Sequence, residues 1–467
     1  MYQTLATLRG ARDAVISLSF STHSKFIAAA GYGGIAVWNL QTFDAVSIPG
    51  NVYNPRNPGY VYTACTWLHF EQVDQHILLL GSQDGTFSTL KWDNKDQLFL
   101  PGFQIKPEET RYQVVSIDIY QAEVLVGKLA RIVVSTADNR IAVYSLSSFL
   151  DLKEIYSIIV EDFSLLAARF CKRTRDIYVF EQMGGGILQL DDTSGDIKSH
   201  QNFGPDPIRA ILRGTVCMDD SSKYFVACTG KAFEMFRLDT IEYVRSFMGV
   251  PPVVLFPKVA TFAEDGVTLI GGTDSGHAIA FDVGDGTQIQ QLEYPKGGLV
   301  QPVAASTVEN GFLVAIAGSA LEIPADVVVF KKNYAPLTAD CKNAPTANLY
   351  HALTRNRSLY HYLLVILGVL LTLNGLHSLL FTCVPLIQYI LEDPMSIARS
   401  QGPLYVHGMF KYDFPVQAKS ETGSKVPLSF ETAMVNPSTF TTSETEVVSR
   451  ALNSAIQARD EDVDTSM

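Results

Sequence analysis

Charged side chains are scarce in this chain of 467 residues, and its cysteines are widely spaced. Asp, Glu, Lys and Arg make up 18% of the chain, below the roughly 25% of ordinary soluble proteins, which favours a segment that leaves water. The net charge is −12 without a block of Lys and Arg, so we expect no nucleic-acid partner. The six cysteines form no C-x-x-C pair. We therefore expect reduced thiols in a cytosolic compartment, with neither a disulfide framework nor a zinc site.

Motifs of catalysis and of metal binding are also missing. The glycine tract at residues 184–186 is not followed by Gly-Lys-Ser/Thr, and Asp274-Ser275-Gly276 lacks the flanks of a Gly-x-Ser-x-Gly turn. The nine histidines include no H-x-x-x-H or H-E-x-x-H pair. We expect no enzymatic activity, no cofactor and no metal site.

What the chain does contain is a repeat. The segments FIAAAGYGGIAVWNL, ARIVVSTADNRIAVYSL and GVTLIGGTDSGHAIAFDV each hold a β-rich run, a Gly/Asp turn and a second run that ends on an aromatic residue. Seven such closing positions occur 45 to 54 residues apart, at Trp38, Trp92, Tyr144, Leu190, Phe236, Phe281 and Phe330. An alternating strand precedes each pair of runs, and a more variable fourth strand follows it. Four short strands every ~40–50 residues predict an all-β fold, a seven-bladed β-propeller over residues 1–335.

The units resemble WD repeats across the same region. The best matches are DNRIAVYS at 138–145, TDSGHAIAFD at 273–282 and DGTFSTLKWD at 84–93. By this resemblance, Asp84, Asp138 and Asp274 are the aspartates that hold the repeat turns, whereas the fourth and fifth units lack one. The seventh unit supplies only three strands. We predict that the N-terminal segment YQTLATL completes it and closes the ring, which removes exposed sheet edges.

Propellers bind partners through the loops on their faces, and loops that join one blade to the next share a face. The longest such loop, PGNVYNPRNPGY at 49–60, carries Tyr and Arg, the residue types enriched at binding hot spots. The candidate partner-binding residues in these loops are Tyr53, Arg56, Arg111, Tyr112, Arg209 and Lys296. The alternative, ordinary solvated loop residues, stays open.

No charged residue lies between Arg357 and Glu392. This run exceeds the ~20 apolar residues that cross a bilayer, so we predict a linker at 336–358 and a transmembrane segment at 359–391. No signal peptide precedes the propeller, which predicts a cytosolic propeller on the endoplasmic reticulum or another endomembrane. A hairpin turning at Asn374-Gly375 is the alternative to a single span. The tail at 392–467 is Ser/Thr-rich, with a short helix predicted near 444–458.

Small side chains form one stripe along the predicted span. Helical periodicity aligns Gly368, Thr372, Gly375 and Thr382. Small residues let helix backbones approach closely in lipid, so this stripe predicts a homodimer through the span, although no G-x-x-x-G motif is present.

Two functions fit these features. The first is a membrane-anchored WD-repeat scaffold that binds cytosolic proteins through a propeller face. The second follows from a resemblance in architecture to the ER-anchored exchange factor of the Sar-type GTPase. That family carries a Gly-rich, cation-binding loop in its first blade, and the corresponding AAAGYGGIAVWN is too short to match it.

Overall fold

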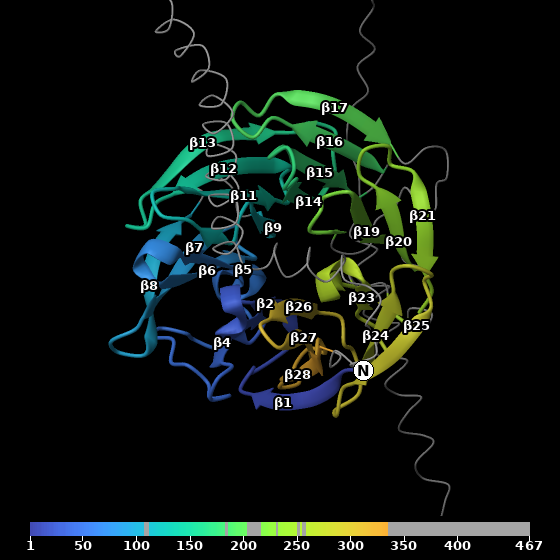
Figure 1. Cartoon of the computed structure of the whole chain (residues 1–467). Coiled ribbons are helices and arrows are strands. Elements are labelled where there is room, and N and C mark those ends of the chain that lie inside the picture. The colour runs from blue at the N-terminus through green and yellow to red at the C-terminus, as the bar shows by residue number, and fades with distance from the viewer. Residues whose placement is uncertain are drawn as a thin grey trace, which may run out of the picture. The chain divides into compact units, whose positions relative to one another are not determined.

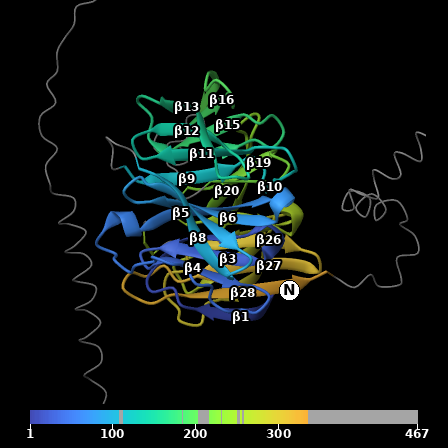
Figure 2. The same cartoon turned by 90° about the vertical axis from the view of Figure 1, so that its left-hand side faces the viewer.

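The computed structural model describes residues 1–106, 112–182, 185–202, 216–229, 232–249, 253–254 and 258–334. These residues form seven sheets arranged as a ring around a central axis (Figure 1). The predicted all-β, seven-bladed propeller is thus confirmed. Figure 2 shows the ring turned by 90°, with successive blades one above another from β12 through β6 to β28.

Each blade is numbered by its place in the chain, and its strands run from the inner to the outer edge. Blade 1 consists of β2 (Val15–Phe20), β3 (Phe26–Gly31) and β4 (Gly34–Asn39). Blade 2 consists of β5 (Tyr62–Phe70), β6 (Gln75–Ser82), β7 (Phe87–Asp93) and β8 (Leu98–Ile105). Blade 3 consists of β9 (Val114–Ile119), β11 (Ala130–Thr136), β12 (Arg140–Leu146) and β13 (Leu152–Ile159). Blade 4 consists of β14 (Leu165–Phe170), β15 (Ile177–Glu181), β16 (Gly186–Leu190) and β17 (Ile197–Asn202).

The remaining blades follow the same plan. Blade 5 consists of β18 (Cys217–Met218), β19 (Tyr224–Cys228), β20 (Phe233–Arg237) and β21 (Tyr243–Phe247). Blade 6 consists of β22 (Ala260–Ala263), β23 (Thr268–Gly271), β24 (His277–Asp282) and β25 (Gln288–Glu293). Blade 7 is β26 (Val303–Val308), β27 (Gly311–Ala317), β28 (Asp326–Asn333) and β1 (Gln3–Arg9). Four short 3-10 turns lie between these strands at Thr22–Ser24, Pro58–Tyr60, Glu71–Val73 and Glu264–Gly266.

The hydrophobic core is divided among the interfaces between blades. Every one of the seven buried clusters found in the described residues joins two neighbouring blades. Between blades 1 and 2, for example, Phe26 stacks on Trp67 with ring centroids 5.8 Å apart, and Trp92 packs beside them. Each sheet therefore buries both faces against its neighbours, which explains why its strands are apolar on both sides.

The seven closing residues occupy equivalent places, since all lie on the third strand of their blades. Trp38 is 1% exposed and Phe281 is 1% exposed. In five of the described blades the pairing with the outer strand shifts register at this residue: Tyr144, Leu190, Phe236, Phe281 and Phe330. Such a bulge increases the local twist of the sheet.

The N-terminal strand closes the ring, as predicted. Strand β1 pairs antiparallel with β28, from Gln3 opposite Lys331 to Arg9 opposite Asp326. Tyr2 also exchanges two hydrogen bonds of 2.8 Å with the side chain of Gln290 on β25 of blade 6. The N-terminal strand β1 is thus paired with β28 in blade 7, and the adjacent Tyr2 is hydrogen-bonded to blade 6.

Two blades depart from the expected four strands. Blade 1 has three strands, and its outer edge is a single bridge between Trp38 and Ala45. Blade 2 gains a fifth, inner strand, β10 (Glu123–Val124), which pairs in parallel with β5. The chain reaches that position because the loop after β9 folds back onto blade 2.

No helix in the described part of the chain is long and apolar enough to cross a membrane. The predicted linker (336–358), span (359–391) and tail (392–467), with the stripe of Gly368, Thr372, Gly375 and Thr382, lie outside the described residues.

Candidate partner-binding face

One face of the ring carries the loops that join successive blades. Consecutive strands within a blade run antiparallel, so the turn between the second and third strands lies on the same side as the join to the next blade. We call this side the loop face and the other side the opposite face. In the first blades, the loop face holds residues 10–14, 47–61 and 83–86; around blade 7 it holds residues 294–302 and 318–325.

Asp13 connects three loops beneath this face. Its carboxylate accepts hydrogen bonds from the backbone N–H of Ala14 at 2.7 Å, from the N–H of Glu322 at 2.6 Å and from the hydroxyl of Tyr53 at 3.1 Å. Asp13 is only 3% exposed, and a buried carboxylate is stable when such donors surround it. The hydrogen bond to this carboxylate raises the pKa of Tyr53 above its ordinary value, so the hydroxyl remains a donor.

Glycines let the β3–β4 turn pack directly against the Asp13 segment. A Cβ on Gly31 would lie 2.1 Å from the Ala14 carbonyl oxygen, and one on Gly33 would lie 2.7 Å from the Asp13 nitrogen. The Tyr32 N–H donates to the Ala14 carbonyl at 3.0 Å. Only residues without a side chain fit this close backbone contact.

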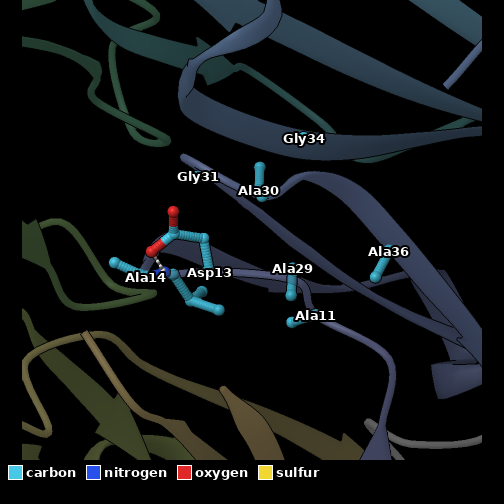
Figure 3. Close-up of a pocket in the computed structure, with 10 residues that line it drawn as sticks. Ala11, Asp13, Ala14, Ala29, Ala30, Gly31, Gly34 and Ala36 are labelled. Atoms are coloured by element: carbon cyan, nitrogen blue, oxygen red, sulfur yellow. Dashed lines mark hydrogen bonds between the residues drawn. The ribbon is translucent and has the colours of Figure 1, made fainter. Parts of the chain in front are cut away.

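The turn encloses a small hollow beside Asp13 (Figure 3). In this view the hydrogen bond between the Asp13 carboxylate and Ala14 lies on one side, and Ala29, Ala30 and Ala36 lie around the rest. The cavity has a volume of about 10 Å³, enough for about one water molecule. The hollow therefore cannot hold a nucleotide or a metabolite, and the two-residue turn leaves no loop there for a bound cation.

Lys296 supports the loop of blade 7 that contains Glu322, at residues 318–325. Its ammonium group lies 3.0 Å from the Asp326 carboxylate and donates to the Pro324 carbonyl at 2.8 Å. The loop at 318–325 is thus held at one end by Lys296 and in its middle by Asp13 through Glu322. Four large apolar side chains project from this supported region, which we call the blade 1–7 patch: Val52 (49% exposed), Tyr53 (45%), Leu321 (53%) and Ile323 (54%).

The three turn aspartates make different contacts. Asp84 accepts hydrogen bonds within its own turn, from the Ser82 hydroxyl at 2.6 Å and the Thr86 N–H at 3.2 Å. Asp138 accepts from the Thr136 hydroxyl and lies 3.6 Å from Arg140.

Asp274 reaches beyond its own turn. It accepts from the N–H groups of Val253 and Val254 at 3.0 and 3.1 Å and from the Gln301 side chain at 3.0 Å, and it lies 2.9 Å from the Lys258 ammonium group. It therefore ties the loops on both sides of blade 6, while Thr273 ties the turn itself through its bond to the His277 carbonyl.

Two of the six predicted partner-binding residues, Tyr53 and Lys296, border the blade 7 loop. Arg56 is exposed in the same long loop as Tyr53. Tyr112 is 49% exposed at the join between blades 2 and 3. Arg111 and Arg209 lie outside the described residues. Sequence reasoning missed Asp13, Leu321 and Ile323; the only local signal for Asp13 was an acidic residue just before an alternating strand.

A second group of polar side chains gathers on the opposite face. His69 and His76 face each other across the β5–β6 hairpin, with stacked rings whose centroids are 4.4 Å apart. Burial, together with the neighbouring His69 and Lys25 charges, lowers the pKa of His76 to about 3. His76 is therefore a neutral imidazole at neutral pH.

No family model matches this chain, and no curated protein matches it either. The fold and the geometry of the two faces accordingly carry the functional argument: a β-propeller of the kind suited to protein–protein interaction.

Proposed function

We propose that this protein is a membrane-anchored, WD-repeat-like scaffold that binds cytosolic protein partners through its loop face. The observation that carries the proposal is the blade 1–7 patch, four exposed apolar side chains on loops fixed by Asp13 and Lys296. Exposed apolar side chains grouped on one surface are typical of interaction sites. Loops that are already fixed lose little entropy when a partner binds.

The chemistry of the patch defines the partner. A binding protein would place apolar side chains on Leu321 and Ile323 and a polar group near the Tyr53 hydroxyl. Arg56 and Tyr112 extend this surface toward blades 2 and 3. The proposal gives the loop face a binding role and no catalytic one.

The membrane part of the proposal depends on the sequence alone. The charge-free run at 359–391 would hold the propeller at an endomembrane, and the stripe from Gly368 to Thr382 would allow two copies to pair. Such anchoring would concentrate partners at the membrane surface.

Proximity labelling from the full-length protein, quantified against variants, tests the binding face. Leu321→Asp combined with Ile323→Asp should remove a defined set of labelled proteins, because charges would replace the apolar contact. Phe149→Ser is the matched control, since Phe149 is 85% exposed but lies on the opposite face. If the double variant and the control label the same proteins, the loop face is not the binding surface.

The exchange-factor alternative requires its own measurement. Addition of the purified protein to a nucleotide-loaded Sar-type GTPase should leave the rate of nucleotide release unchanged under the scaffold proposal. An acceleration that depends on the protein concentration would favour the alternative.

A further inference from the structure

The opposite face contains a buried pair of histidines, and one ring nitrogen of each, Nδ1, has no hydrogen-bond partner among the described residues. His69 is 5% exposed and His76 is 3% exposed. Both Nδ1 atoms are themselves buried. Each Nδ1 is therefore an atom that can accept a hydrogen bond or coordinate a metal ion, whereas Nε2 of His69 already faces Asp74.

Carboxylates and a third histidine surround this pair. Asp74 Oδ1 lies 3.1 Å from His69 Nε2, and Glu123 Oε1 lies 3.0 Å from His23 Nε2. Two triads can be drawn in which one ligand atom per residue lies within 4.8 Å of the others: His69, Asp74 and His76, and His23, His69 and Glu123. His69 belongs to both triads, so the five residues form one cluster.

The cluster combines a rigid part with an adjustable part. His69 and His76 are opposite each other in the β5–β6 ladder, which fixes their separation. The side chains of Asp74, His23 and Glu123 are 70%, 65% and 42% exposed, so they are free to rotate. Ligand atoms of one tetrahedral zinc ion lie roughly 3.4 Å apart, given bond lengths of ~2.0–2.1 Å. Rotations of the three exposed side chains and of the two imidazole rings would bring the present spacing, which is within 4.8 Å, to that value.

We propose that the opposite face binds one divalent transition-metal ion of the zinc class, with His69, His76 and Asp74 as three ligands and either His23 or Glu123 as the fourth. Imidazole nitrogens with carboxylate oxygens are the donor set that Zn²⁺ prefers over Mg²⁺ or Ca²⁺. The positive charge of Lys25, which lies near the cluster, would repel a bound cation. The negative charges of the carboxylates are needed to offset this repulsion.

The position of the cluster indicates what the ion would do. His23 comes from the turn between β2 and β3 of blade 1, His69 and His76 from blade 2, and Glu123 from β10, which follows the inner strand of blade 3. One ion would therefore connect blade 1 with blade 2 and with the segment that folds back from blade 3, near the inner edge of the ring. The site would be structural, since a metal bound only by the folded state stabilises it.

Zinc titration of the full-length protein tests this proposal. After EDTA treatment and desalting, the protein should bind about one Zn²⁺ per chain in competition with a chromophoric chelator, and Co²⁺ should give the absorption bands of a bound ion. Zn²⁺ should also raise the melting temperature relative to EDTA. Absence of saturable Zn²⁺ binding would overturn the proposal.

Variants locate the ion. Asp74 has φ +43° at an exposed turn, a conformation that Asn tolerates, so Asp74→Asn should fold normally and lose affinity by more than about tenfold. His76→Asn should also lose binding. His200→Asn, an exposed histidine of blade 4, is the matched control and should bind like the parent. Equal affinity in Asp74→Asn, His76→Asn and the parent would place the ion elsewhere and contradict the site.

Discussion

Three carboxylates beneath the loop face are paired with lysines that come from the joins between blades. The pairs are Asp84 with Lys106 at 3.3 Å, Asp274 with Lys258 at 2.9 Å, and Asp326 with Lys296 at 3.0 Å. They differ in burial: the Lys258 side chain is 10% exposed, whereas that of Lys106 is 59% exposed. Because water weakens exposed ion pairs, the pair of Asp274 with Lys258 should contribute more to the stability of the ring than the pair of Asp84 with Lys106.

We therefore predict unequal effects of two matched substitutions. Lys258→Met should lower the free energy of unfolding by about 3–5 kcal/mol, because it leaves the buried Asp274 carboxylate without its cation. Lys106→Met should lower it by about 0–1 kcal/mol. Urea denaturation of the two variants measures both free energies of unfolding. Equal denaturation midpoints would show that the buried pair stabilises the protein no more than the exposed pair.

The pH dependence of stability provides a second prediction for Asp274. Burial raises the pKa of Asp274, but the Lys258 ammonium group, the Gln301 side chain and the Val254 N–H outweigh it, so the pKa lies below the ordinary value. A carboxyl whose pKa is lowered by folding stabilises the protein above its unfolded pKa of about 3.9, and this contribution is lost as the pH falls through the lower folded value.

The stability gap between the parent and Asp274→Asn should thus be full at pH 7 and shrink below about pH 4. Thermal melts between pH 3 and pH 7 measure the gap. A gap of the same size at both ends would mean that the ionised carboxylate does not stabilise the folded state.

At the scale of elements, strand β1 carries the closure of the ring. Its removal would expose the edge of β28 and the apolar residues that Leu8 and Tyr2 cover in the interfaces of blade 7. A soluble fragment of residues 10–335 should therefore aggregate or melt well below a fragment of residues 1–335, because an uncovered strand edge invites association. Differential scanning calorimetry compares the two fragments, and identical melting temperatures would contradict a role for β1.

Features that follow from local periodicity could be predicted from the sequence. Examples are the closing residues from Trp38 to Phe330 and the N-terminal strand that completes blade 7. Both can be recognised within short segments, because alternating side chains indicate strands and Gly or Asp residues indicate turns. Pairings between distant segments could not be predicted. Asp13 meets Glu322 across 309 positions, and β10 joins blade 2 only after the loop beyond β9 folds back.

The histidine cluster was missed for the same reason. His69 and His76 are not spaced as a helical metal motif, since they meet as a cross-strand pair. Their neighbour His23 comes from blade 1, and Glu123 lies on β10, in the segment that folds back after β9. A single sequence does not show such cross-blade contacts.

At the scale of the whole molecule, different parts of the chain would have different tasks. The blade 1–7 patch would bind partners, the cluster on the opposite face would hold an ion that connects blades 1 and 2, and the run at 359–391 would keep the propeller at a membrane. The proposed binding of cytosolic partners and the proposed membrane anchor agree with each other only if the propeller faces the cytosol.

Protease protection in sealed microsomes tests this central claim most directly. Protease added from outside should degrade the propeller and spare a fragment that holds the span and a C-terminal tag, since the bilayer and the lumen would shield them. Loss of the C-terminal tag under the same treatment would favour the hairpin topology over the single span. Complete release of the protein by alkaline carbonate, or a propeller that resists protease until the membrane is dissolved, would contradict the account.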